Sequence, residues 1–522
     1  MKRMARVGQI TDFGFWILDF GLAPVAVACF LASAAYAGEW THCAGDATRA
    51  SSAHRGPTGL GQAAWIVPPP VNMEYVGQSS PVVYGGRVFV NARVFDGSVQ
   101  VANRVIAYAA EGGAELWTTD VDTDGYDSWS SPAADTRHQT VIVGTGARVH
   151  ALDMTTGAIV WQTALERPIV NASPAVTEDV FSGATSANRV LITDYSGFGG
   201  AAKLYALNTD PYDAAGNPYQ LGDIVWTADL PGASGNSPAY ADGTVYVAST
   251  GGVILARGAL DGAPRWTTDV AAQGYPQYAA FFGGVTVRNG YVYAASYGFY
   301  GGQNNSGLFK LDAATGGIVW VTACERTNSI PVVTDDGRVF LSGGIAGFGS
   351  AVKVQAWRDL GGTVTALWDT YQATGGSLVV GGRTHQPAYA DGLLYAGRPS
   401  AGLPYGPNVE LLILDTTRMP ADPGFVVARY GGAGDSPALA DGRLYSPGSG
   451  GLLAFAGWRA GDMNCDGSVD FDDINPFVTA LVGRAGYEAR YPECRYVNAD
   501  CNDDGNVDFD DINPFVALLV QG

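Results

Sequence analysis

The sequence is poor in lysine and in positive charge generally. Only four of its 522 residues are lysine, and 50 acidic residues outnumber 30 basic ones, giving a formal net charge of −20. A protein that binds duplex nucleic acid needs an excess of basic side chains to neutralise phosphates. The composition therefore argues against nucleic acid as a partner.

Cysteine is also scarce, and no two cysteines are adjacent or spaced as C-x-x-C. Five of them follow the N-terminal segment described next, so at least one thiol has no partner within the mature chain. Cys494 and Cys501 are close enough in sequence to form a bridge, which would leave Cys465 free. Pairings that involve Cys43 or Cys324 are equally compatible with the sequence.

A membrane-spanning helix requires about 20 uninterrupted apolar residues, and Asp19 interrupts the apolar stretch near the N-terminus, so a membrane anchor there is the less favoured alternative. Residues 1–37 instead have the pattern of a signal peptide: Lys2, Arg3 and Arg6 precede a short apolar stretch, and Ala37 ends a small-x-small cleavage motif. We expect a protein that is secreted or displayed at the cell surface, or held in the periplasm, with no membrane span after cleavage.

Glycine is abundant, at 71 residues, and 47% of the chain is apolar. This mixture suits many short strands joined by tight turns and does not suit disorder. One repeated unit starts at Ser237-Pro238, turns at Asp242-Gly243 and again at Asp261-Gly262, and ends at Trp266. Its apolar runs are predicted strands, and its Asp-Gly pairs are predicted hairpin turns.

Eight such units follow one another at intervals of roughly 50 residues. The last unit lacks its final strand, and a spare strand at 64–67 precedes the first unit; pairing the two would close a ring without an open edge. We predict an all-β fold, an eight-bladed β-propeller over residues 60–457. Seven blades remain the alternative, because the units near Val285 and over 351–368 are irregular.

The segments Leu152–Trp161 and Leu311–Trp320 resemble the repeat of the quinoprotein propellers. This resemblance implies that each Trp packs between neighbouring blades and that small residues allow their close approach. It does not imply activity. We expect no quinone, because the adjacent cysteine pair is missing and Lys203, Lys310 and Lys353 all fall in predicted blade strands.

The tail, residues 461–522, carries 13 acidic and three basic residues and contains two twelve-residue loops followed by short apolar helices. Oxygen-bearing side chains fall at loop positions 1, 3, 5, 9 and 12, with Gly at position 6, as a flexible Ca²⁺ loop requires. We predict two Ca²⁺ ions and these ligands: Asp462, Asn464, Asp466, Ser468, Asp470, Asp473, Asp500, Asn502, Asp504, Asn506, Asp508 and Asp511.

Asp instead of Glu at position 12, and two loops in tandem, make this tail similar to a dockerin, a small α-helical, double EF-hand-like domain. The resemblance implies docking to a cohesin-like or other docking protein. Loop positions 10 and 11, which help to select the partner in clostridial-type dockerins, are Phe471-Asp472 and Phe509-Asp510 here and depart from the small hydroxyl residues common there. The class of partner therefore stays open.

Aromatic residues recur in the predicted loops that share one end of the propeller with the blade connections. We interpret them as a binding face for protein or carbohydrate. The favoured function is a non-catalytic propeller attached through its tail; the alternatives are an enzyme acting on polysaccharide and, less favoured, a quinone-dependent dehydrogenase. The candidate ligand-face residues are Trp129, Tyr195, Phe198, Tyr297, Phe299, Tyr300, Phe348 and His385.

Overall fold

The computed structural model describes residues 39–521 apart from 54, 124–127, 178–179, 183–184, 198–199, 401–406, 456–459, 465–468, 492–493, 495 and 503. The predicted signal peptide over residues 1–37 lies outside the described residues. Within the part of the chain that the structure describes, no helix combines the length and apolar character needed to cross a membrane.

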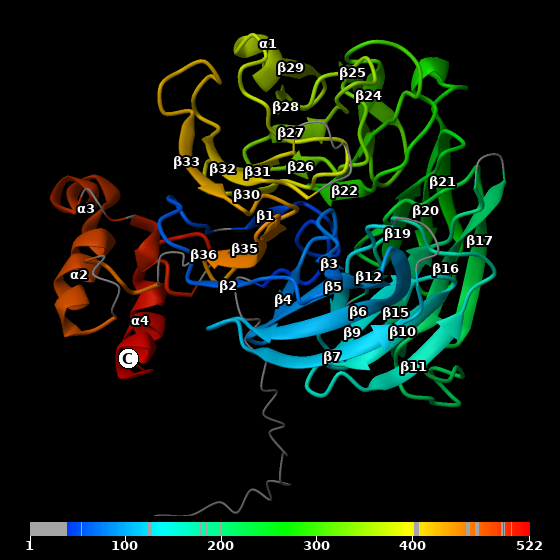
Figure 1. The fold of residues 1–522 in the computed structure, drawn as a ribbon, viewed down its shortest axis with the longest axis horizontal. Helices are drawn as coiled ribbons and strands as arrows, with labels where there is room; N and C mark the ends of the chain where they lie inside the picture. The colour runs from blue at the N-terminus through cyan, green and yellow to red at the C-terminus, as the bar shows by residue number, and fades with distance from the viewer. Residues whose placement is uncertain are drawn as a thin grey trace, which may run out of the picture. The chain divides into compact units, whose positions relative to one another are not determined.

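Eight antiparallel sheets surround a common axis, each forming one blade (Figure 1). The first four blades follow in chain order. Blade 1 has β4 (Val82–Tyr84), β5 (Arg87–Asp96), β6 (Val99–Ala109) and β7 (Glu115–Val121), with β3 (Met73–Tyr75) added on β5; blade 2 has β8 (Ala133–Asp135), β9 (Thr140–Thr145), β10 (Arg148–Asp153) and β11 (Ile159–Ala164). Blade 3 has β12 (Ala175–Val176), β15 (Arg189–Thr193), β16 (Ala201–Asn208) and β17 (Ile224–Pro231), and the hairpin β13 (Val180–Ser182) and β14 (Thr185–Ala187) is inserted between β12 and β15. Blade 4 has β18 (Ala239–Ala241), β19 (Thr244–Ala248), β20 (Val253–Gly258) and β21 (Pro264–Asp269).

The other four blades complete the ring and confirm the predicted count of eight. Blade 5 has β22 (Val285–Arg288), β23 (Tyr291–Ala295), β24 (Ser306–Asp312) and β25 (Ile318–Cys324), preceded by the short helix η1 (Pro276–Tyr278); blade 6 has β26 (Val332–Val333), β27 (Arg338–Gly343), β28 (Lys353–Asp359) and β29 (Val364–Asp369), followed by α1 (Thr370–Ala373). Blade 7 has β30 (Ala388–Ala390), β31 (Leu393–Arg398), β32 (Glu410–Asp415) and β33 (Val426–Gly431), and β1 (Ser52–Ala53) pairs parallel with β30. Blade 8 has β34 (Ala438–Ala440), β35 (Arg443–Gly448), β36 (Gly451–Phe455) and β2 (Trp65–Val67).

Strand β2 closes the ring as the sequence predicts. It pairs antiparallel with β36, with Trp65 opposite Ala454 and Val67 opposite Leu452. The outer strand of blade 8 therefore comes from the start of the propeller, so blades 8 and 1 are linked by the chain itself. This arrangement gives β36 a partner along its outer edge.

The Trp at the end of several units bridges to the next blade. Trp117 of blade 1 donates a hydrogen bond from Nε1 to the carbonyl oxygen of Met154 in blade 2, at 2.9 Å. Beneath the indole lies Gly157, whose φ is 73° and where a Cβ would come within 2.5 Å of Trp117 Cε3. The same pairing joins Trp161 to Gly222 and Trp266 to Gly316. The structural role implied for these residues by the quinoprotein repeat is confirmed.

A run of side-chain hydrogen bonds across blades 1 to 4 explains the recurrent Ser-Pro. The backbone N–H of Ser80 donates to Ser131 Oγ at 2.9 Å, that of Ser131 donates to Ser173 Oγ at 2.9 Å, and that of Ser173 donates to Ser237 Oγ at 3.0 Å. Each serine hydroxyl thus accepts from the preceding blade. Hydrogen bonds of this kind fix the angular position of one blade relative to the next.

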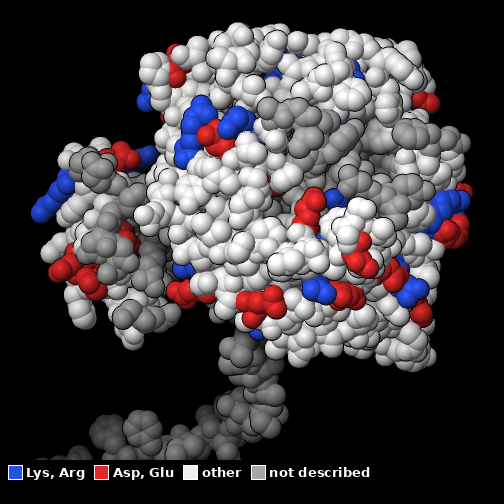
Figure 2. Space-filling model, viewed as in Figure 1, with Lys and Arg blue, Asp and Glu red and all other residues white. Residues whose placement is uncertain are grey.

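Ion pairs also connect neighbouring strands and blades, and Figure 2 shows acidic and basic side chains next to one another at several places on one face. His138, after β8, lies between two carboxylates: its Nδ1 is 2.8 Å from Asp135 Oδ2 and its Nε2 is 3.0 Å from Asp210 Oδ1. Burial opposes protonation, but the two carboxylates outweigh it and raise the pKa of His138 to about 9. The protonated ring therefore links blade 2 to blade 3 at neutral pH.

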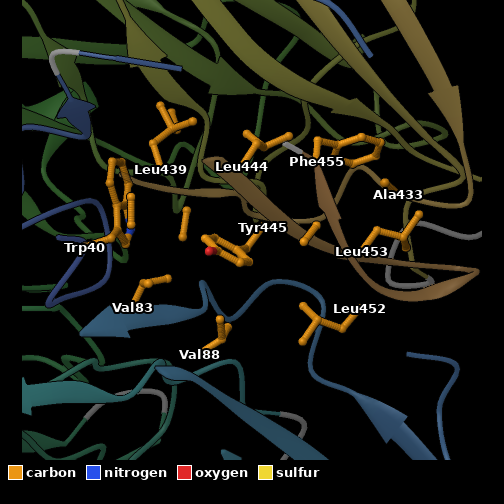
Figure 3. Close-up of a cluster of buried hydrophobic side chains, with 14 of the residues drawn as sticks. Trp40, Val83, Val88, Ala433, Leu439, Leu444, Tyr445, Leu452, Leu453 and Phe455 are labelled. Carbon is orange, nitrogen blue, oxygen red and sulfur yellow. The ribbon is translucent and has the colours of Figure 1, made fainter. Parts of the chain in front are cut away.

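Residues 40–51 form a segment, here called the plug, that hydrogen-bonds to the innermost strands of successive blades. Trp40 exchanges two backbone hydrogen bonds with Val83 of blade 1, Thr41 O accepts from blade 2, and Ser51 O accepts from blade 7. Figure 3 shows Trp40 lying against Val83 and Leu439, two side chains on opposite sides of the closure point. The sequence did not predict this segment, which lies upstream of the predicted propeller boundary at residue 60.

The guanidinium of Arg49 holds the centre of the plug. Arg49 is fully buried and donates to four carbonyl oxygens, those of Cys43, Ser173, Pro174 and Pro238, at 2.8 to 2.9 Å. Burial of a charge is tolerated when every donor has an acceptor. Arg49 thus ties the plug to blades 3 and 4.

Replacing Gly157 by Ala tests the packing of blade against blade. Gly157 and Gly243 have the same φ of 73°, but a Cβ at Gly243 would have no heavy atom within 4 Å. We expect Gly243→Ala to lower the free energy of unfolding by about 1 kcal/mol, from backbone strain alone. Gly157→Ala should cost about 2 to 4 kcal/mol, because overpacking against Trp117 adds to the strain. If urea denaturation showed the same decrease in the free energy of unfolding for both variants, the packing role of Trp117 would be contradicted.

The pH dependence of thermal unfolding tests the His138 link. Because its pKa in the folded protein is about 9, above its usual 6.5, its stabilising effect is complete below pH 6.5 and disappears as the pH rises through 9. We expect the difference in Tm between the wild type and His138→Gln to shrink over this range. Arg137 is a second basic neighbour of the same carboxylate, with its Nε 3.9 Å from Asp210 Oδ1. A pH-independent difference would refute the proposed protonation.

Candidate functional site

Three side chains from distant parts of the ring meet at one end of the propeller. The guanidinium carbon of Arg383, between β29 and β30, lies 5.8 Å from the ring centre of Trp129 and 5.8 Å from that of Tyr297. Trp129 precedes β8 and Tyr297 follows β23. A cation over aromatic faces is attracted by the ring quadrupoles. The contact shows that a second-to-third-strand loop and two blade connections share one face, as the sequence predicts.

An aromatic cluster stands beside Arg383. Tyr297 and Phe299 have ring centres 5.0 Å apart, and Phe282 lies edge-on to both, at 5.7 and 5.2 Å. Edge-to-face packing of this kind stabilises the rings beyond simple burial. Part of the cluster still faces solvent, because Phe299 is 45% exposed and the neighbouring Tyr300 is 94% exposed.

The backbone of this aromatic loop is held by Arg326, whose NH1 and NH2 groups donate to the carbonyl oxygens of Phe299 and Gly301 at 3.3 and 3.1 Å. At the far end of the loop, Asn304 donates its N–H to Glu325 Oε2 at 3.2 Å and accepts from Lys353 Nζ at 3.0 Å. The exposed rings therefore sit on a fixed loop.

Lys353 is fully buried in β28 and completes a network beneath the loop. Its Nζ lies 3.3 Å from Glu325 Oε2 and 3.1 Å from Asp369 Oδ2. Buried carboxylates paired in this way are structural supports. The other lysines of the propeller also lie in blade strands, as predicted: Lys310 is paired with Asp359 at 2.7 Å, and Lys203 with Glu166.

The remaining candidates are distributed over the same loops. Phe348, 58% exposed, lies between β27 and β28, and a Cβ on the adjacent Gly349 would be 3.5 Å from Gly301 O in the aromatic loop. Tyr195 forms a bridge with Ser234 in the connection between blades 3 and 4. Phe198 lies outside the described residues. The aromatic candidates that the structure brings together are Trp129, Tyr297, Phe299, Tyr300 and Phe348.

His385 is not part of the exposed face. It is 4% exposed and lines a cavity, and burial lowers its pKa to about 3. Sequence reasoning placed it near the loop face but missed two other lining residues, Arg383 and Asp435. The sequence does contain a feature that points to this pair: His385 and Asp435 occupy the same place in their repeat units, two residues before the proline that starts the first strand. The corresponding residues of five other units are small or uncharged: Ser79, Ser130, Ala172, Asn236 and Ser329.

The tail contains α2 (Ile474–Val482), α3 (Arg484–Arg490) and α4 (Ile512–Gln521), with the 3-10 turns η2 (Phe471–Asp473), η3 (Tyr496–Ala499) and η4 (Phe509–Asp511). Phe477 of α2 and Phe515 of α4 occupy matching places in the two halves. Their rings stack with centres 4.0 Å apart and planes 8° from parallel. The repeated sequence thus packs on itself.

Both predicted calcium loops close in the same way. Asp473 Oδ1 accepts from the N–H groups of Met463 and Asn464 at 2.6 and 2.9 Å, and Oδ2 accepts from Asp470 N–H at 2.9 Å. Asp511 accepts from Cys501, Asn502 and Asp508 in the identical pattern. Both carboxylates are fully buried. The carboxylate at loop position 12 therefore closes each loop by accepting hydrogen bonds from the loop's own backbone.

The predicted ligands that are described fit a Ca²⁺ site in their chemistry, since all are carboxylate, amide or backbone oxygens. Asp500 accepts from Asp504 and Gly505 N–H, and Asn502 Oδ1 accepts from Asp504 N–H, so the oxygens of the second loop turn toward its own backbone. Asp466 and Ser468 of the first loop lie outside the described residues.

The state of the cysteines in the tail resolves one disulfide pairing that the sequence left open, that of Cys494 with Cys501. Cys494 is disulfide-bonded, whereas Cys501 is a free thiol, as are Cys43 and Cys324. A local bridge between Cys494 and Cys501 is therefore wrong. Proximity in sequence does not suffice, because Cys501 is held in the second loop, where its N–H donates to Asp511 and its Sγ to Asn498 O.

The sequence over residues 64–210, 218–298 and 276–415 matches the family model described as outer membrane protein assembly factor BamB. The chain belongs to this BamB family. No curated protein matches it.

Solved structures share the propeller of this BamB-family chain. A quinohemoprotein alcohol dehydrogenase, ADHIIG from Pseudomonas putida HK5, has 13% identity and a TM-score of 0.54, with 83% of this chain and 78% of that chain covered. A europium-containing methanol dehydrogenase has 12% identity and a TM-score of 0.52, covering 80% and 91%. BamB from Moraxella catarrhalis has 18% identity and a TM-score of 0.49, covering 75% and 97%. At these identities the two dehydrogenases show a common fold only.

Removal of the position-12 carboxylates tests calcium binding by the tail. We expect Asp473→Asn with Asp511→Asn to weaken Ca²⁺ affinity about tenfold or more, because each loop loses a charged ligand and the Oδ2 acceptor of one closing hydrogen bond. The matched control is Asp472→Asn with Asp510→Asn, exposed neighbours that change the net charge equally. Calorimetric titration of the full chain measures both. Similar losses in the two double variants would show a general charge effect instead of ligation.

Proposed function

We propose that this protein is an exported, non-catalytic propeller that binds a protein through its aromatic loop face and is attached to a surface or assembly through its calcium-dependent, dockerin-like tail. The family description, an outer membrane assembly factor, supports a role in binding proteins outside the cytoplasm. Carbohydrate remains the other ligand that exposed aromatic rings suit.

The observation that carries the attachment is a duplicated apolar ridge on the tail. Its first half is Phe471, Ile474, Val478 and Val482, which are 78%, 37%, 51% and 87% exposed; its second half is Phe509, Ile512, Val516 and Val520, which are 77%, 39%, 49% and 82% exposed. Residues at this spacing follow one face of a helix. Two matching apolar ridges in so small a domain favour a docking role.

Two features support a non-catalytic propeller. Glu325 and Asp369, the acidic residues beneath the aromatic loop, are buried and share Lys353, so neither is placed as a free general acid or base. The face of Trp129, which a bound quinone would need for stacking, lies against the guanidinium of Arg383. A saturable, quinone-dependent reduction of a dye by the purified protein would contradict this part of the proposal.

Docking is tested with the full chain and a panel of immobilised cohesin domains. We expect Ca²⁺-dependent binding that chelation abolishes and that Phe471→Ser with Phe509→Ser reduces at least about tenfold, because the exposed rings supply apolar contact area. Leu360→Ser, at a 61% exposed apolar site on blade 6, is the control and should bind normally. Binding that survives both chelator and the double substitution would refute docking through the ridge.

A further inference from the structure

A cavity of about 250 Å³ lies between blades 6, 7 and 8. Its wall is formed by the β27–β28 and β31–β32 loops, by two blade connections, and by residues 77–78 before β4. Backbone forms much of the wall, because five of the lining residues are glycine: Gly77, Gly344, Gly347, Gly381 and Gly382. The described lining holds no aromatic side chain. Such a wall suits a small polar molecule better than a sugar, which needs an aromatic platform.

His385 presents a hydrogen-bond donor to this cavity. Its Nε2 accepts the N–H of Gly397 at 3.0 Å, so in the neutral ring the proton is on Nδ1. Nδ1 is buried and has no partner. A buried donor without an acceptor costs free energy, which a bound ligand would recover.

Asp435 presents the complementary acceptor. Its Oδ1 accepts from Asn408 N–H at 2.9 Å, whereas Oδ2 is buried without a partner. The side chain is 4% exposed. Burial raises the pKa of Asp435 to about 7; the Asn408 hydrogen bond reduces this effect and the charge of Glu74 adds to it. A cationic group in the cavity would stabilise the ionised carboxylate.

The lining also includes Arg383, so a cation and an anion, in addition to a neutral donor, border one small space. The unpartnered Nδ1 of His385 suits an anionic acceptor on a ligand, and the unpartnered Oδ2 of Asp435 suits a cationic donor. We propose that the cavity binds a small zwitterion of the amino-acid class, with its ammonium group on Asp435 and its carboxylate on His385 Nδ1 and Arg383. This site goes beyond the docking function and does not depend on it.

The test compares whole ligands with their halves on the purified full chain. L-alanine and L-serine are the zwitterions, ethylamine carries the ammonium alone, propionate carries the carboxylate alone, and glycerol is an uncharged polyol. We expect calorimetry to detect the zwitterions and to find each half at least about tenfold weaker, since one ionic hydrogen bond is lost. Binding of glycerol or ethylamine as strongly as L-alanine, or no binding by either amino acid, would overturn the proposal.

A matched pair of variants locates the site. Asp435→Asn keeps the shape and the Oδ1 acceptor and should weaken L-alanine binding at least about tenfold. Asp194→Asn is the control: Asp194 is also buried with a raised pKa, but it lies in blade 3, where Lys203 N–H and Tyr205 OH donate to it. Unchanged affinity in Asp435→Asn would refute the assignment.

The wild type provides a second measurement if Asp435→Asn does not fold. Because ammonium binding requires ionised Asp435, L-alanine affinity should rise about tenfold per pH unit below 7 and level off above it. In the part of the chain that the structure describes, the charge of Glu74 acts on Asp435, Arg383 borders the same cavity, and His385, with a pKa of about 3, stays neutral over this range. An affinity that does not change between pH 5 and 8 would contradict the proposal.

Discussion

The propeller depends on the closure of its ring. Each blade sheet packs on the sheets beside it, so an unclosed ring would expose the edge of β36 and the side of blade 1 that packs on blade 8. Closure here has three layers: β2 pairs with β36 at the outside, the serine hydroxyls link blade starts, and the plug joins the innermost strands at the centre. The same kind of bond recurs between blades 7 and 8, where Gln386 donates its N–H to Ser436 Oγ.

Two of these layers, the β2–β36 pairing and the plug, come from the first thirty described residues. These residues must contact strands that lie up to almost four hundred residues further along the chain. Contacts of such sequence separation are slow to form, because the entropy of closing a long loop precedes their gain. The plug carries visible strain: Ala44, Arg49 and Ser51 all have positive φ. Conformations of this kind persist where surrounding contacts fix them, and the four carbonyl acceptors of Arg49 do so here.

The features of the propeller that could be predicted from the sequence are those that recur from one repeat unit to the next. Among the described residues the Trp–Gly contact occurs five times around the ring, the hairpin turn also recurs, and both Asp242 and Gly243 have the positive φ that such a turn needs. The plug does not repeat, since its residues meet different blades along its length, and it could not be predicted from the repeat. Arg383 and Asp435 lie in blade connections, and their meeting in one cavity depends on ring geometry. The calcium ligands could be proposed because each loop is local in sequence.

The closed ring also determines how the loop face can bind. Because Arg326 and the Lys353 network hold the aromatic loop from below, Phe299 and Tyr300 are exposed without being free to reorient as a unit. A surface that is already ordered loses less conformational entropy on association, so more of the contact energy remains as affinity. The same rigidity keeps His385 and Asp435 on the wall of one cavity although they belong to different blades. A repeat scaffold thus places chemistry at positions that only its closure brings together.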